Sequence, residues 1–88
     1  YTRYVASFYG EYGIRCNAIL AGAFPHVDFE SDSTVDDQEF IKRLENKTVL
    51  GRVGVVNDLI GPLLFLASEA SGYITGQGLS VDGGWTVR

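Results

Sequence analysis

A chain of 88 residues is long enough for one domain at most, and at this length folding buries only about 60 to 65% of the unfolded surface, so its stability alone should be marginal. With 45% hydrophobic and 20% charged residues, the composition is that of a globular protein. The net charge of −4 and the scattering of the seven basic residues argue against a nucleic-acid partner.

The sequence also argues against a membrane-bound or secreted protein. Its longest apolar run, residues 59–67, contains Gly61 and Pro62 and falls far short of the roughly 20 residues that span a bilayer. The sequence does not begin with basic residues followed by an apolar segment, so we expect no signal peptide. The single cysteine, Cys16, cannot form an internal disulfide, which suits a cytoplasmic location.

Because the sequence contains no methionine, we expect that Tyr1 is not the natural start and that upstream residues are cut away or missing.

The first part of the chain predicts the end of a helix followed by a strand. Large apolar residues recur at the spacing of one buried helical face, at Tyr1, Tyr4, Val5 and Phe8. Gly10 is a suitable stop for this helix. Residues 14–20 form a short, mostly apolar run that is typical of a strand in a parallel sheet. Open α/β sheets bind ligands beyond the carboxyl ends of their strands, so residues 21–24 are where a cofactor would be met.

The acidic segment 28–39 has two interpretations. Five of its acidic side chains fall on positions of a calcium-loop template, namely Asp28, Glu30, Asp32, Asp36 and Glu39. Against calcium, Ser33 replaces the glycine of the sharp turn, and a strand rather than a helix precedes the loop. The favoured alternative makes Asp36 a helix N-cap and Glu39 the second half of a carboxylate capping box. We therefore expect no metal site.

The last part of the chain predicts a link, a helix and a strand. In the link, residues 48–54, Arg52 is expected to tie down loop carbonyls. Residues 59–67 predict a helix with a very wide apolar stripe. Only the ends of this helix are expected to be exposed to water. A glycine-rich loop then breaks the helix, and residues 79–82 read as a strand that ends at a turn containing Gly83 and Gly84.

Four short motifs occur in the order and spacing of one known family. They are I-R-C-N-A-I at residues 14–19, L-G-R-V-G at 50–54, Y-I-T-G-Q at 73–77 and D-G-G at 82–84. Together they resemble the C-terminal end of a classical short-chain dehydrogenase/reductase. The resemblance covers nearly the whole chain but only about the last third of the family's fold. It implies an α/β class, with residues 1–88 as the C-terminal fragment of one Rossmann-type domain built on a doubly wound parallel sheet.

This resemblance also implies where cofactor and substrate lie. In the family, the backbone just after the first of these strands lies against the nicotinamide of NAD or NADP, which assigns Gly22, Ala23 and Phe24 to cofactor binding. The following loop and helix form a lid over the substrate. Here that lid is residues 27–47. The candidate substrate contacts are His26, which directly precedes the lid, and Val27, Phe40 and Leu44 within it. No catalytic residue is assigned, because the family's glycine-rich loop, its serine and its Y-x-x-x-K pair belong to the part that is not in the sequence.

We therefore interpret the chain as the C-terminal part of an NAD(P)-dependent oxidoreductase that moves a hydride between nicotinamide and a small alcohol or ketone. Among the members of the family, the chain most resembles those of the gluconate 5-dehydrogenase type or the 3-oxoacyl-carrier-protein reductase type. These residues would supply the nicotinamide-side wall, the substrate lid and the surface of a homo-oligomer, a dimer or tetramer, and should be inactive alone. The alternative is a truncated, non-catalytic module for binding or self-association, because two strands with helices expose a sheet edge and an apolar face.

Overall fold

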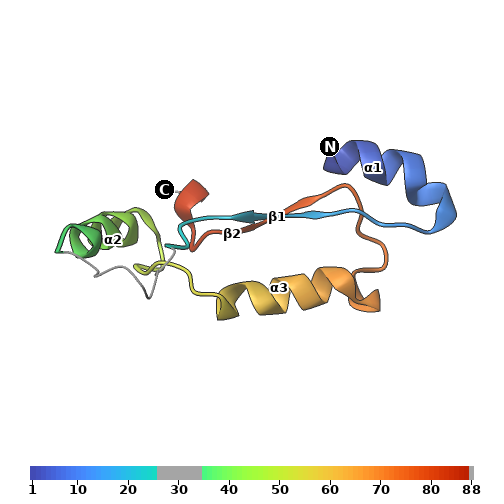
Figure 1. Ribbon diagram of the computed structural model, residues 1–88. Helices are drawn as coiled ribbons and strands as arrows, with labels where there is room; N and C mark the ends of the chain where they lie inside the picture. Colours follow the sequence, from blue (N-terminus) through green and yellow to red (C-terminus); the bar gives the residue numbers. More distant parts are fainter. Residues whose placement is uncertain (26–34, 88) are drawn as a thin grey trace.

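The computed structural model describes residues 1–25 and 35–87 (Figure 1). Its helices and strands are, in chain order, α1 (Thr2–Tyr9), β1 (Ala18–Ala21), α2 (Val35–Lys47), α3 (Asn57–Ala67) and β2 (Gly78–Val81). Short 3-10 turns follow α1, α3 and β2, at Gly10–Tyr12, Glu69–Ser71 and Trp85–Val87. Within these described ranges, each helix is either too short or too polar to cross a lipid bilayer.

A two-stranded parallel sheet forms the centre of the molecule. β1 and β2 pair in the register Ala18 with Gly78 through Ala21 with Val81. In Figure 1, α3 runs below the sheet, α1 lies above its amino end, and α2 and the C-terminal turn lie beyond the carboxyl ends of both strands. The prediction that two adjacent strands run in the same direction is confirmed. The architecture is that of an α/β fragment.

The first strand is shorter than the apolar run 14–20 predicts. β1 contains only residues 18–20 of that run and ends one residue beyond it, at Ala21. The earlier residues contact the loop before β2 through separate hydrogen bonds rather than a regular ladder. The Gly76 N–H donates to the Cys16 carbonyl at 2.7 Å. The Cys16 backbone N–H donates to Thr75 Oγ1 at 3.1 Å, and Asn17 Nδ2 donates to the Ile74 carbonyl at 3.0 Å. This segment therefore lies beside its partner without being a regular strand.

Arg15 joins the start of this segment to the end of α3. Its Nη1 atom donates to the Ser71 carbonyl at 2.8 Å, to Ser71 Oγ at 2.9 Å and to the Ile74 carbonyl at 3.2 Å. Its Nη2 atom donates to the carbonyls of Leu66 and Ser68 at 3.2 and 3.0 Å. The last carbonyls of a helix have no partner within the helix, and a guanidinium can supply several donors at once. Arg15 thus closes the C-terminal end of α3 against the sheet.

The structure confirms the predicted end of the first helix and corrects the predicted start of the second. α1 ends before Gly10, as predicted, but Gly10 keeps a helical conformation (φ −60°, ψ −35°) and opens a 3-10 turn. The left-handed residue that ends this segment is Gly13, with φ 78°. α2 begins at Val35, so Asp36 lies inside the first turn of the helix and is not its N-cap.

The apolar faces of the helices are more exposed than the sequence predicts. Leu64 of α3 is 64% exposed, although only the ends of this helix were expected to meet water. On α1, Tyr4 and Phe8 are 62% and 58% exposed, and their rings pack on each other with centroids 4.7 Å apart. A sheet of two strands has too little surface to cover two amphipathic helices. Among the described apolar residues, only Ala6 is buried, with 8% of its surface exposed.

We predict that replacing Arg15 by lysine destabilises the protein by about 1.5 to 3 kcal/mol, the scale of hydrogen bonds to charged groups. A lysine ammonium keeps the charge but cannot reproduce the fork of guanidinium donors. Urea unfolding would measure the loss. Arg3→Lys, on the exposed surface of α1, is the matched control and should leave the midpoint unchanged. Equal midpoints for both variants would contradict the role assigned to Arg15.

Candidate functional site

A cleft of about 520 Å³ opens at the carboxyl end of the sheet. Its walls come from three separate stretches of the chain: residues 20–25 at the end of β1, Phe40 and Leu44 of α2, and the residues after β2, including Asp82 and Trp85. Parallel strands present their carboxyl ends at one edge, so the segments that follow them meet there. The lining is mainly apolar with a few polar groups, the usual make-up of a small-molecule site.

The structure brings together five of the seven predicted site residues. The candidates for cofactor binding, Gly22, Ala23 and Phe24, line the cleft beside the lid candidates Phe40 and Leu44. The other two, His26 and Val27, lie outside the described residues, as does most of the acidic segment.

Gly22 allows the end of β1 to approach the turn after β2. A Cβ atom at this position would lie 2.6 Å from the Cβ and 2.7 Å from the Cα of Asp82. Its backbone N–H donates to the Val81 carbonyl at 3.0 Å, which continues the sheet ladder to the cleft. A side chain at Gly22 would therefore force the two walls of the cleft apart.

The next two residues are held by the link between α2 and α3. The Gly54 N–H donates to the Ala23 carbonyl at 2.8 Å. Gly54 also leaves room for the aromatic ring of Phe24, which a Cβ atom on Gly54 would overlap. The link thus fixes both the backbone and the ring position of this cleft wall.

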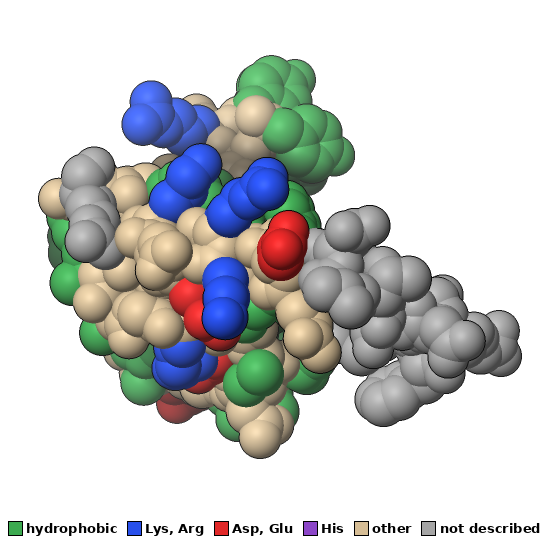
Figure 2. Space-filling model, turned by 90° about the vertical axis from the view of Figure 1, so that its left-hand side faces the viewer, with side chains coloured by type: hydrophobic (Ala, Val, Ile, Leu, Met, Phe, Trp, Pro, Cys, Tyr) green, Lys and Arg blue, Asp and Glu red, His purple; other side chains and the backbone are tan. Residues whose placement is uncertain are grey.

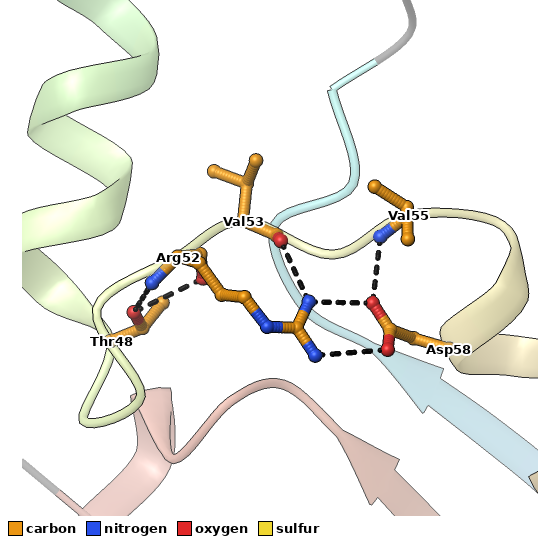
Figure 3. Close-up of polar contacts among 5 residues, drawn as sticks. All are labelled: Thr48, Arg52, Val53, Val55 and Asp58. Atoms are coloured by element: carbon orange, nitrogen blue, oxygen red, sulfur yellow. Dashed lines mark hydrogen bonds and ion pairs between the residues drawn. The ribbon is translucent and has the colours of Figure 1, made fainter.

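A polar network organises the link itself (Figure 3). Thr48 is only 2% exposed, and its Oγ1 accepts from the Arg52 backbone N–H at 3.1 Å. The same hydroxyl lies 3.0 Å from the Glu45 carbonyl and 3.2 Å from the Arg52 carbonyl, either of which can accept its proton. Thr48 therefore ties the end of α2 to the middle of the link.

Arg52 holds the link to the first turn of α3. Its Nη1 and Nη2 atoms bind the two carboxylate oxygens of Asp58 at 2.7 and 3.0 Å, and Nη1 also donates to the Val53 carbonyl at 3.2 Å (Figure 3). The predicted contact of Arg52 with a loop carbonyl is confirmed, whereas its carboxylate partner was not anticipated. Asp58 also accepts from the Val55 N–H at 2.9 Å. The Arg52 hydrogen bond first, and then that of Val55, lower the pKa of Asp58 to about 2.

Asp82 shapes the turn that forms the opposite wall. Its two carboxylate oxygens accept from the Gly84 N–H and from the Thr86 hydroxyl, both at 3.0 Å, and these bonds lower the pKa of Asp82. Sequence reasoning treated this turn as purely structural and missed that Asp82, Trp85 and Thr86 line the cleft. The available signal was that a turn after β2 must lie at the same sheet edge as residues 21–24.

The charge around the cleft is mixed. Figure 2 looks onto the end of the molecule that carries α2 and shows Lys and Arg side chains gathered there beside a few acidic ones. Basic residues of α2 and the link are Lys42, Arg43, Lys47 and Arg52. The same helix also carries the acidic residues Glu39 and Glu45, so the surface does not favour an anionic over a neutral ligand. In the part of the chain that the structure describes, no cluster of three or more His, Cys, Asp or Glu side chains could hold a metal ion.

Comparison with known proteins identifies the fold around this cleft. A family model described as enoyl-(acyl carrier protein) reductase matches residues 1–86. The computed structure is similar to a short-chain dehydrogenase from Leptospira borgpetersenii with bound NAD⁺, with a TM-score of 0.82 and 40% identity over 97% of this chain and 30% of that one. The chain therefore belongs to the short-chain dehydrogenase/reductase family, and its sheet is part of a Rossmann-type fold.

Other relatives share this extent of similarity. The L-rhamnose-1-dehydrogenase of Scheffersomyces stipitis is 49% identical over 90% of this chain and 30% of its own length. A gluconate 5-dehydrogenase of Burkholderia cenocepacia, in complex with NADP and tartrate, has a TM-score of 0.83 and 38% identity over 99% of this chain and 33% of that one. The chain thus spans about a third of the length of the proteins it matches.

We predict opposite effects for two glycine-to-alanine substitutions. Gly22→Ala should destabilise the protein by about 1 to 3 kcal/mol, because the new methyl group overlaps the backbone of Asp82. Gly61→Ala, in α3, meets no atom within 4 Å and should stabilise by up to about 1 kcal/mol through helix propensity. Thermal unfolding measures both effects. A melting temperature of Gly22→Ala equal to or above that of the wild type would contradict the packing described for Gly22.

We also predict that the Arg52–Asp58 pair contributes stability that depends on pH. The pKa of Asp58 is lower in the folded protein than its ordinary value of 3.8. Its contribution is therefore fully present above that value and is lost as the pH falls through about 2. Asp58→Asn should be less stable than wild type near neutral pH, and the difference should shrink across this acid window.

Urea unfolding at several pH values measures this dependence. Arg52→Gln removes the partner and should lose the same pH-dependent part of the stability. A difference between wild type and Asp58→Asn that stays constant as the pH falls through the window would rule out the pair as its source.

Proposed function

We propose that the chain is the C-terminal part of an NAD(P)-dependent oxidoreductase that transfers a hydride between nicotinamide and the carbon of a small alcohol or ketone. The observation that carries this proposal is the cleft at the carboxyl end of β1, in which the backbone of residues 22–24 faces Phe40 and Leu44 of α2. Dinucleotides bind at this edge of doubly wound sheets. Solved structures with similar folds hold NAD⁺ or NADP.

In this proposal, each wall of the cleft has one task. Gly22, Ala23 and Phe24 provide the wall beside the nicotinamide, and the hydrogen bonds of Gly22 and Ala23 hold their backbone in place before the cofactor arrives. Phe40 and Leu44 cover the substrate with apolar surface and exclude water from it. The nicotinamide, when bound, accepts or supplies the hydride. The upstream part of the protein supplies the groups that bind the pyrophosphate and move the proton, so residues 1–88 alone are inactive.

The proposed substrates are small polyhydroxy compounds. Relatives carry the names L-rhamnose 1-dehydrogenase and gluconate 5-dehydrogenase, and a gluconate 5-dehydrogenase structure holds tartrate. The cleft offers apolar walls with the hydroxyls of Ser80 and Thr86 among them, and basic side chains of α2 lie on the same end of the molecule. A sugar or sugar acid presents hydroxyl groups to such polar atoms.

A second candidate is a non-catalytic module that binds itself or another protein. Its support is the exposed apolar surface, which includes Leu63 and Leu64 of α3 and Tyr4 and Phe8 of α1. Exposed apolar surface of this kind is found at protein interfaces. In the oxidoreductase, the same surface is covered by the upstream sheet or by a second subunit.

The test is to express the full-length protein and residues 1–88 alone, and to follow the absorbance of the reduced nicotinamide. With NAD⁺ or NADP⁺ and a panel of aldoses and aldonic acids, the full-length protein should turn over at least one substrate, and residues 1–88 should turn over none. Sedimentation shows whether residues 1–88 self-associate. The second candidate would replace the oxidoreductase if three results came together. The protein isolated from its natural source would have a mass of 9.6 kDa, it would self-associate, and it would show no nucleotide-dependent turnover.

A further inference from the structure

We propose that the C-terminal turn, residues 82–87, positions α2 over the cleft and thereby sets substrate affinity, with Lys47 and Trp85 as the positioning residues. The part of this inference that concerns substrate rests on the proposed oxidoreductase function. The part that concerns the placement of α2 rests on contacts within the chain alone.

Lys47, the last residue of α2, contacts the turn directly. Its Nζ lies 5.6 Å from the centroid of the Trp85 ring, within the range of a cation–π interaction. Trp85 also lines the cleft, together with Phe40 and Leu44 of the same helix. One side chain therefore forms a wall of the cleft and holds the end of the helix that covers it.

The residues that follow α2 are seated on the same turn. The Leu50 N–H donates to the Gly83 carbonyl at 3.0 Å. A Cβ atom on Gly84 would lie 2.7 Å from Val49 Cβ, so this glycine allows the link to approach closely. Gly83 and Gly84 have φ values of 62° and 88°, which side-chain-bearing residues seldom adopt. The double glycine thus shapes a surface that fits the start of the link.

Hydrogen bonds between its own residues fix the shape of the turn that follows β2. Asp82 accepts from the Gly84 N–H and the Thr86 hydroxyl, both at 3.0 Å, and the Trp85 N–H donates to the Asp82 carbonyl at 3.1 Å. By contrast, α2 packs extensively against no other helix or strand within the described residues. A few contacts therefore decide where α2 lies. Those of Lys47 and Leu50 go to this turn, whereas the hydrogen bonds of Thr48 go to Glu45 and the link.

The position of α2 affects binding because its apolar side chains face the cleft. Phe40 and Leu44 contact a substrate only when the helix lies over the cleft, so a helix that leaves this position part of the time gives weaker binding in proportion. Cofactor affinity should change little, because residues 22–24 are held by β2 and Gly54 and not by α2.

The experiment compares Lys47→Gln, Trp85→Ala and Trp85→Phe in the full-length protein. The control is Val87→Ala, an exposed residue of the same turn that does not line the cleft. Limited digestion with trypsin reports the placement of α2 through cleavage after Lys42 and Arg43, and steady-state kinetics report the KM values for substrate and nucleotide. Lys47→Gln should raise the substrate KM about two- to fivefold, which corresponds to a cation–π contact of about 0.5 to 1 kcal/mol.

Trp85→Ala should raise the substrate KM further and speed cleavage in α2, Trp85→Phe should give intermediate values, and the nucleotide KM should stay within about twofold. The inference would be overturned if Lys47→Gln had the same rate of cleavage in α2 and the same substrate KM as the control Val87→Ala. An equal rise of both KM values, which indicates a general loss of structure, would overturn it too. If even the wild type has no nucleotide-dependent turnover, the proposed function fails, whereas the trypsin comparison still decides whether the turn positions α2.

Discussion

The parallel pairing of β1 with β2 is the constraint on which the rest of the structure depends. It joins residues 18–21 to residues 78–81 and brings the carboxyl ends of both strands to one edge. Two walls of the cleft follow from this pairing, because the loop after β1 and the turn after β2 then lie side by side, and the link makes a backbone hydrogen bond to each of them. Gly22 makes the closest approach possible, since any larger residue would meet Asp82.

Buried polar groups, rather than an apolar core, fix the loops around this sheet. Thr48 and Ser71 are fully buried, and both lie where one segment crosses another. Ser71 accepts from Arg15 at the end of α3, and Thr48 joins α2 to the link. Hydroxyl groups in such positions satisfy backbone donors and acceptors that would otherwise lose hydrogen bonds to water. The apolar surfaces contribute less, because two strands cannot cover them.

The sequence allowed the element types and the family to be predicted, but not all of the contacts. Apolar periodicity indicated the helices, and four spaced motifs indicated the fold. Periodicity shows which helical face is apolar but not what covers it, so the exposure of Leu64 was not foreseen. The hydrogen bond from Asn17 to the carbonyl of Ile74, far away in sequence, could not be predicted from the apolar run that precedes β1. Trp85 was missed as a cleft residue because its neighbours Phe40 and Lys47 are far from it in sequence.

The separation of the paired strands along the chain has a consequence for biosynthesis. No ladder hydrogen bond of this sheet can form until β2 has left the ribosome, because its partner β1 is made long before it. Until then, the nascent chain carries an open β1 edge, and contacts between distant segments form slowly. Such intermediates are prone to aggregation. A stop codon upstream of Gly78 would therefore release a product in which β1 lacks the partner strand that it has in this structure.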